Sequence, residues 1–157
     1  MLEDKKFMRV AIKEAVKARE KGDYAIGAVI VKDGQIIARA SNRSKIDNDV
    51  TKHAEMVAIQ KASKKLKTRY LTGCILYTTH EPCPMCAAAT VWAKLSRIVF
   101  GARMGDIAGY SFKNGNDDWQ WRAIRISARE VLEKGEPKVG MTEEFMRAEC
   151  RKLFHDT

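Results

Sequence analysis

The sequence has few of the residues that mark secreted, membrane-bound or low-complexity proteins. It contains four cysteines and three prolines in 157 residues, and no apolar run approaches the roughly 20 residues that a transmembrane helix requires. Its first residues are mostly charged, so a signal peptide is not predicted. No segment is repeated. These features argue against a disulfide scaffold and a membrane span, and we expect a cytoplasmic protein.

The composition is that of a globular chain with an excess of positive charge. With 157 residues and 45% apolar content, we expect a single domain over residues 1–157 with its own core. The net charge is +9, and such an excess attracts phosphate groups. Much of it lies on the outer face of the predicted first helix and in the run 61–69, where solvated side chains are expected. Nucleic acid therefore stays open as a partner.

Helical and strand patterns alternate along the chain. An apolar stripe at helical spacing predicts a first helix that stops near Lys21. The apolar runs 26–31 and 35–40 flank Asp33-Gly34, a dipeptide that favours a tight hairpin turn. We therefore predict two antiparallel strands. The other predicted elements are a loop at 41–52, a helix at 53–65 capped by Thr51, a strand at 74–79, a helix at 83–93, a strand at 97–101, a strand at 122–127 and a helix from Thr142.

Two short motifs carry the chemistry. His53-Ala54-Glu55 opens one predicted helix, and Glu81-Pro82-Cys83-Pro84-Met85-Cys86 leads into another. Cysteines three apart at a helix start lie on nearly the same side of it, and the free N–H groups there favour thiolates. Prolines suit this position because the missing N–H groups cost little.

The set of His53, Cys83 and Cys86 suits zinc. Three protein ligands leave a fourth tetrahedral position for water, which is typical of a catalytic zinc site. Glu55 is then placed to take a proton from that water. An isolated C-x-x-C could instead be a redox pair or half of a structural zinc site, but neither has a use for Glu55.

These motifs match the H-x-E…P-C-x-x-C signature of zinc-dependent nucleobase deaminases. From about Met8 to Ala102 the sequence resembles the cytidine-deaminase-like superfamily, in the branch of tRNA adenosine deaminases, guanine deaminases and fungal-type cytosine deaminases. The resemblance implies an α/β fold, a three-layer α/β/α sandwich with a mixed five-stranded sheet, and a homodimer. It also implies one Zn²⁺ per chain, held by His53, Cys83 and Cys86. Glu55 would shuttle protons, and the substrate base would meet Asn42, Ala54 and Pro82.

The substrate is less clear than the reaction. Asn48-Asp49, the second motif and Trp92-Ala93 are similar to bacterial guanine deaminases, which favours a free base, guanine ahead of cytosine. The runs 99–103 and 145–154 resemble tRNA adenosine deaminases, and the positive charge agrees. Met104 and Ala88 depart from that family's pattern. We predict deamination of a free guanine or cytosine type of base, with tRNA adenosine as the alternative. A basic zinc module that binds nucleic acid without turnover is a remote third hypothesis.

Four further residues are weaker candidates for substrate contacts. His80 precedes Cys83 closely enough to edge the pocket or compete as a metal ligand, although a hydrogen bond within the turn is the use that we favour for it. Trp119 and Trp121 could stack on a base or could anchor their loop. Trp92 is expected in the core or in a subunit interface. The remaining cysteines, Cys74 and Cys150, are predicted to be buried packing residues.

Overall fold

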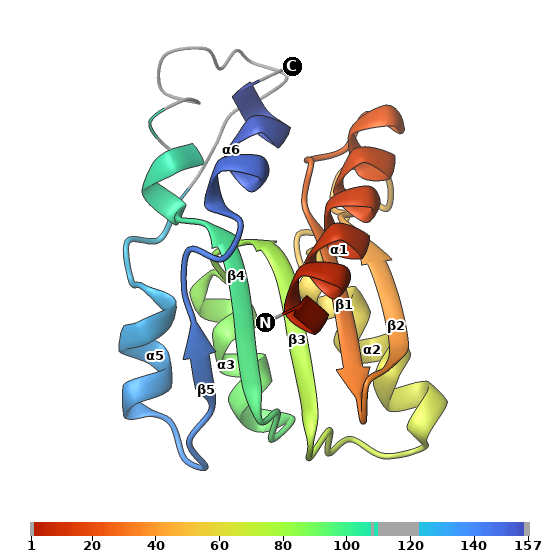
Figure 1. Cartoon of the computed structure of the whole chain (residues 1–157), viewed down its shortest axis with the longest axis vertical. Helices are drawn as coiled ribbons and strands as arrows, with labels where there is room; N and C mark the ends of the chain where they lie inside the picture. Colours follow the sequence, from red (N-terminus) through yellow and green to blue (C-terminus); the bar gives the residue numbers. More distant parts are fainter. Residues whose placement is uncertain (1, 108, 110–122, 156–157) are drawn as a thin grey trace.

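A computed structural model of the chain describes residues 2–107, 109 and 123–155. Its centre is a sheet of five strands in the order β2-β1-β3-β4-β5 (Figure 1). The strands are β1 (Gly27–Lys32), β2 (Gln35–Ser41), β3 (Cys74–His80), β4 (Arg97–Ala102) and β5 (Gly140–Thr142). Strand β1 is antiparallel to both β2 and β3, whereas β3, β4 and β5 are mutually parallel. The predicted mixed five-stranded α/β fold is therefore confirmed.

Helices cover both faces of the sheet (Figure 1). One face carries α1 (Leu2–Glu20), which packs on β1, β2 and β3, and α6 (Arg147–His155), which packs on β4 and α1. The other face carries α2 (Ala54–Leu66), α3 (Pro84–Trp92) and α5 (Ala128–Lys134), packed side by side. Parallel strands need such crossover helices, so both faces of the central strands are buried. Among the described helices, none combines the length and apolar character that a membrane crossing requires.

The hairpin between β1 and β2 forms as the sequence predicts. Asp33 and Gly34 both have positive φ, at 50° and 72°, which is the requirement of the two-residue turn that matches strand twist. The pairing then shifts: Ile30 faces Ala38 but Val31 faces Ile36. This irregularity is a β-bulge that leaves Ile37 as the extra residue of β2.

Small residues bring α1 close to the sheet. The predicted apolar stripe is buried, with Phe7 2% exposed and Ala11 and Ala15 fully covered. A Cβ at Gly27 would collide with the backbone of α1 at Ala11 and Ala15, so only glycine fits there. The same principle holds at Gly101, where a Cβ would collide with Cys150. Cys74 and Cys150 are both buried and free, as predicted.

Three local predictions are wrong. Helix α2 begins after His53, which replaces Thr51 as the N-cap residue. The segment 123–127 forms no strand, and the fifth strand is instead Gly140–Thr142, which is too short to give a sequence pattern. The last helix begins at Arg147 and not at Thr142. Thr142 still belongs to β5, and Glu144 and Met146 have positive φ angles, which a right-handed helix does not allow.

Candidate active site and metal centre

The metal-binding side chains come from the N-terminal ends of two neighbouring helices. His53 is the N-cap of α2 and Cys83 is the N-cap of α3, and both have extended backbone with ψ of 152° and 169°. Cys86 follows in the first turn of α3, where Pro84 occupies a position that needs no N–H. Because His53 lies just outside its helix, its side chain and that of Glu55 can reach one pocket, although residues two apart within a helix point away from each other.

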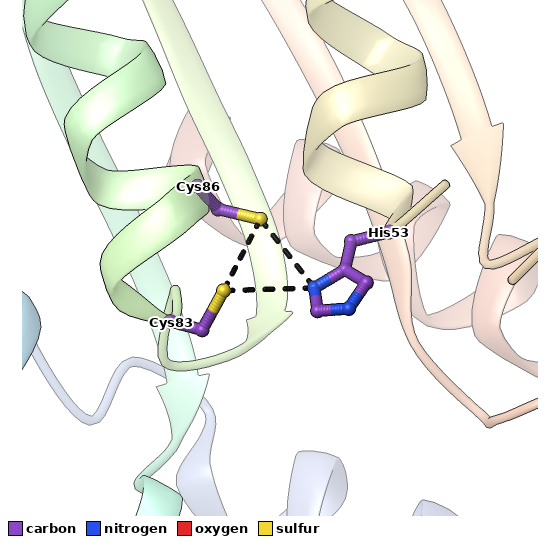
Figure 2. Close-up of side chains that lie close together, drawn as sticks. All are labelled: His53, Cys83 and Cys86. Carbon is purple, nitrogen blue, oxygen red and sulfur yellow. Dashed lines mark hydrogen bonds between the residues drawn. The ribbon is translucent and has the colours of Figure 1, made fainter. Parts of the chain in front are cut away.

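The three ligand atoms form a nearly equilateral triangle (Figure 2). His53 Nδ1 lies 3.6 Å from each sulfur, and the sulfurs of Cys83 and Cys86 are 3.7 Å apart. Tetrahedral zinc, with Zn–S of about 2.3 Å and Zn–N of about 2.0–2.1 Å, requires about 3.6 Å between sulfur and nitrogen and about 3.8 Å between sulfurs. The triangle therefore fits one zinc ion with an open fourth position.

The pKa values of the two cysteines show that a negative charge is favoured at this site, as a cation requires. The hydrogen bond with Cys86, followed by one with His53, lowers the pKa of Cys83 to about 4. The same contact raises the pKa of Cys86 well above its usual value, and burial adds to the rise. Of these two sulfurs, 3.7 Å apart, one is thus favoured as a thiolate and the other keeps its proton. A divalent cation at the centre of the triangle would take the place of that proton.

Glu55 lies against this triangle and is almost completely buried, with 2% exposure. Its Oε2 is 3.7 Å from the sulfur of Cys86, and its Oε1 accepts a hydrogen bond of 3.1 Å from the hydroxyl of Thr78 on β3. Burial raises the pKa of the Glu55 carboxyl, while the nearby His53 opposes the rise. A carboxyl with a raised pKa beside an open metal position can both accept and return a proton.

A cavity of about 650 Å³ opens in front of Glu55 and the triangle. Its walls are mostly apolar, and the chain supplies them from five separate segments. The apolar lining residues include Ile26, Val50, Met85, Met104 and Ile124, and the polar ones include Asn42, Lys45, Asn48, Asp49 and His80. At the edge, the ammonium of Lys45 lies 4.6 Å from the centre of the Tyr24 ring. A concave apolar site with a few polar groups suits a planar organic ring.

A buried carboxylate organises the loop on one side of the cavity. Asp23 is 6% exposed and accepts hydrogen bonds from the side-chain amide of Asn42 and from the backbone N–H groups of Lys45 and Ile46, at 2.8, 3.0 and 3.0 Å. Asn42 in turn donates to Ser44 and accepts from the N–H of Ala54 at 3.3 Å. The loop that follows β2 is thereby fixed to the start of α2.

The structure brings most of the predicted site residues together, but not all. His53, Glu55, Cys83, Asn42 and His80 line the cavity, and Cys86 completes the triangle. Burial lowers the pKa of His80 to about 4, and its ring packs near Phe154.

The other predicted contacts are placed differently. Ala54 and Pro82 are buried and are not among the residues that line the cavity, so their contacts with the base stay predictions. Trp92 is 79% exposed at the far end of α3, so it is neither a core residue nor near the cavity. Trp119 and Trp121 lie outside the described residues.

Sequence reasoning missed three polar residues around the site. Thr78 holds Glu55, Asp23 holds Asn42, and Glu81 accepts two backbone hydrogen bonds beside Cys83. Thr78 had a usable signal, because a polar residue inside an apolar strand is often a buried hydrogen-bonding group. Asp23 follows a glycine at a helix end and looks like an ordinary turn residue.

Comparison with known proteins links the chain to one family. The sequence profile described as "Cytidine and deoxycytidylate deaminase zinc-binding region" matches residues 1–102, which include both motifs.

Several relatives are named for tRNA. The chain is 51% identical over 102 residues to a tRNA-specific adenosine deaminase of Bacillus subtilis, and 48% identical over 96 residues to that of Aquifex aeolicus. These alignments cover 65% and 61% of this chain, and 63% and 64% of the relatives, so the chain spans a little under two thirds of their length. A guanine deaminase of Bacillus subtilis is 44% identical over 117 residues, covering 74% of this chain and 72% of the relative.

Solved structures extend the likeness beyond residue 102. A structure from a study of A-to-I editing by tRNA:A34 deaminases matches with a TM-score of 0.78 and 33% identity, covering 95% of this chain and 99% of the other. The guanine deaminase of Bacillus subtilis matches with a TM-score of 0.66 and 35% identity over 82% and 88% of the two chains. The guanine deaminase of Nitrosomonas europaea, at 22% identity and a TM-score of 0.79 over 96% and 81%, shows the shared fold.

Proposed function

The chain belongs to the zinc-binding family of cytidine and deoxycytidylate deaminases, and on that premise we propose that it hydrolyses adenosine in tRNA to inosine and releases ammonia. Water supplies the oxygen of the new carbonyl group; one of its protons ends on the ring nitrogen, and the other leaves with the amino group as ammonia. The substrate is the finer part of this proposal, since the two motifs serve every branch of the family equally.

One observation carries the choice of tRNA adenosine. The solved tRNA:A34 deaminase aligns over 95% of this chain and 99% of its own, so the likeness includes the part of the chain after the shared motifs. Several relatives with 46% identity or more are also named as deaminases of adenosine or adenine in tRNA. The sequence alone favours a free base, and the comparisons favour its alternative. Guanine remains a second candidate because the guanine deaminase of Bacillus subtilis matches a larger share of this chain.

The reaction follows from the geometry of the site. His53, Cys83 and Cys86 would hold zinc, which when bound acts as a Lewis acid and makes water acidic enough to lose a proton near neutral pH. Glu55 would take that proton and donate it to the ring nitrogen beside the amino-bearing carbon. It would then remove the proton of the newly added hydroxyl as the carbonyl forms and pass it to the leaving amine. The Thr78 hydroxyl holds one oxygen of Glu55, so the other stays directed toward the metal site.

The walls of the cavity suit a flipped purine nucleoside. Ile26, Met85 and Ile124 offer apolar surfaces for the ring, and desolvation by them strengthens the electrostatic contacts inside. Both N–H groups of the Asn42 amide are engaged, by Asp23 and Ser44. Its oxygen accepts a hydrogen bond from the N–H of Ala54, which leaves one lone pair for the base. Lys45, at the edge of the cavity, is placed to meet a phosphate of the RNA.

We also propose that the protein acts as a homodimer. The last turn of α3 exposes Trp92, and Ala88 and Ala89 on the same helix are only partly covered. An apolar helix surface of this kind is stabilised by contact with another chain.

Ammonia release from a panel of substrates tests the proposal. The zinc-loaded protein is incubated with an anticodon stem-loop that carries adenosine at the wobble position, with the same RNA carrying guanosine there, and with free guanine, cytosine and adenine. We expect release from the first RNA alone, with a steep loss of affinity as salt rises because phosphate contacts displace counterions.

The other outcomes each select a different function. Release from free guanine alone would replace tRNA adenosine by the second candidate. If the protein binds the stem-loop but releases ammonia from none of the substrates, it is a binding module and not an enzyme.

A further inference from the structure

Glu81 is a buried carboxylate that the proposed chemistry does not use. It lies between β3 and α3, two residues before Cys83, and is 5% exposed. Its Oε2 accepts a hydrogen bond of 2.9 Å from the backbone N–H of Met104, and its Oε1 accepts one of 3.1 Å from the backbone N–H of Ala128. Both oxygens of one carboxylate are thus engaged by backbone groups.

The two donors belong to parts of the chain that are far apart in sequence but face the same cavity. Met104 follows β4 and lines the cavity itself. Ala128 is the first residue of α5, and the segment leading into it places Ile124 on the cavity wall. Glu81 therefore connects two segments of the wall to the turn that carries Cys83.

The chemistry makes this connection rigid. A carboxylate buried away from water needs donors, and hydrogen bonds to a charged group are about twice as strong as neutral ones. Backbone N–H donors also have no side-chain rotation, so their positions are fixed relative to the acceptor. The N–H of Glu81 adds a bond of 2.7 Å to the carbonyl of Ala102, which holds the turn against the end of β4.

We propose that Glu81 is a positioning residue: it sets the distance between the metal-binding turn and the wall formed by Met104 and Ile124, and thereby the affinity for the substrate base. The inference rests on the proposed function for the identity of that base. Glu81 acts through the wall, because both of its oxygens are already occupied by Met104 and Ala128.

Two variants remove these bonds in different ways. Glu81→Gln keeps the length of the side chain but replaces one acceptor by a donor, which then faces another donor. Ala128→Pro removes one N–H and leaves Glu81 intact. Proline suits this place because Ala128 is the first residue of α5, and Ser127 before it already has the extended backbone that proline requires, with ψ of 156°.

A matched control lies at the same helix start. The side chain of Glu130 accepts a hydrogen bond from the N–H of Ser127 in the capping box of α5, but it is exposed. Glutamine also fits a capping box, so Glu130→Gln makes the same chemical change without touching the connection to the metal-binding turn.

Three measurements on each full-length variant test the proposal: zinc per chain, hydrogen exchange of the Met104 and Ala128 amides by NMR, and KM and kcat for the stem-loop. For both Glu81→Gln and Ala128→Pro we expect full zinc content, a rise in KM of about tenfold and a kcat within about twofold. Faster amide exchange is expected in Glu81→Gln, because Ala128→Pro has no amide at position 128 and keeps the bond from Met104. Glu130→Gln should match the wild type in all three.

The outcomes separate this proposal from the proposed function. Amide exchange needs no substrate, so unchanged exchange in Glu81→Gln overturns the connection even if the enzyme acts on another base. Faster exchange with unchanged KM overturns the role in affinity. Loss of zinc in step with activity would show instead that Glu81 supports the metal ligands. If the wild type deaminates guanine and not the stem-loop, the same KM comparison is made with guanine. If Glu81→Gln does not fold, the KM of Ala128→Pro tests the role in affinity: a rise of about tenfold supports it, and an unchanged KM overturns it.

Discussion

On each face of the sheet, a buried carboxyl group accepts a hydrogen bond from a hydroxyl of β3, yet the pKa values of the two carboxyl groups shift in opposite directions. On the face covered by α1, the Tyr77 hydroxyl donates to Asp4 at 2.6 Å, and Arg97 donates to the same oxygen at 2.9 Å. On the other face, the hydroxyl of Thr78 donates to Glu55 at 3.1 Å. Successive residues of a strand point to opposite faces, so Tyr77 and Thr78 serve the two regions separately.

The difference lies in the partners. Burial opposes ionisation of Asp4, but the hydrogen bonds from Tyr77 and Arg97 and the charge of Arg97 outweigh it and lower its pKa. Burial of Glu55 is not offset in this way, and its pKa rises. A carboxylate with a cationic side-chain partner stabilises the fold, whereas a buried carboxyl with a raised pKa suits the proton transfer that we propose for Glu55. Five variants test this contrast, from the largest expected effect to the smallest.

Replacing a metal ligand should have the largest effect on turnover, and it should leave the contacts of Asp4 on the opposite face unchanged. Cys86→Ser keeps the size of the side chain but removes a thiolate, so we expect loss of zinc and a fall in turnover of at least ~10³. Elemental analysis gives zinc per chain, and ammonia release gives turnover. A variant that retains one zinc per chain and normal turnover would remove Cys86 from the site.

Glu55→Gln should lose at least ~10² in turnover while it keeps zinc, because glutamine cannot carry the proton. Since burial raises the pKa of Glu55, a neutral side chain suits the site, and the free energy of unfolding should not fall. Zinc content, turnover and urea unfolding are measured on one preparation. Near-normal turnover with full zinc content would refute the role of Glu55.

Thr78→Val, which removes the hydroxyl but keeps the shape, should lower turnover about tenfold, the usual effect of one hydrogen bond to a charged group. The neighbouring change Tyr77→Phe is the matched control on the opposite face, and should leave kcat unchanged. If both variants lose turnover equally, the two faces are not independent.

Asp4→Asn should act on stability alone. It breaks the contact with Arg97, whose side chain is 32% exposed, so we expect the free energy of unfolding to fall by about 1–3 kcal/mol. Zinc content and kcat should stay at wild-type values. Loss of kcat at temperatures where the variant is folded would contradict the separation of the two regions.

The smallest effect is on the pH dependence of stability. The pKa of Asp4 is lower in the folded protein than its ordinary value of 3.8, so its contribution is complete above about pH 4 and is lost as pH falls through the lower folded value. The stability difference between wild type and Asp4→Asn should therefore shrink below about pH 4. A difference that is constant down to acid unfolding would show that Asp4 is not ionised in the folded protein.

Sequence patterns predict the elements that have strong local signals. The apolar stripe of α1, the Asp33-Gly34 turn and the proline-rich start of α3 each agree with the structure because local chemistry determines them. The three-residue strand β5 could not be predicted, since its pairing with β4 is set by distant contacts and three residues give no periodicity.

The residues of the candidate site also fall into two groups, those that a local motif predicts and those that only distant contacts place. His53, Glu55, Cys83 and Cys86 follow from their spacing, because metal and proton chemistry restrict the residue types. Thr78, Asp23 and Glu81 are identified by hydrogen bonds to residues that lie 19 to 47 positions away in the sequence. A local sequence pattern does not encode such distant contacts. The residues that we propose to do the chemistry are thus predictable from local motifs, whereas the residues that hold them in position are not.

The bulge at Ile37 has a consequence for association between molecules. It lies on β2, which is one edge of the sheet in the described part of the chain, and the opposite edge, β5, has only three residues. A bulged edge and a very short one are both poor templates for an added strand, so chains should not join sheet to sheet into fibrils. Any assembly of this protein should therefore form through its helices.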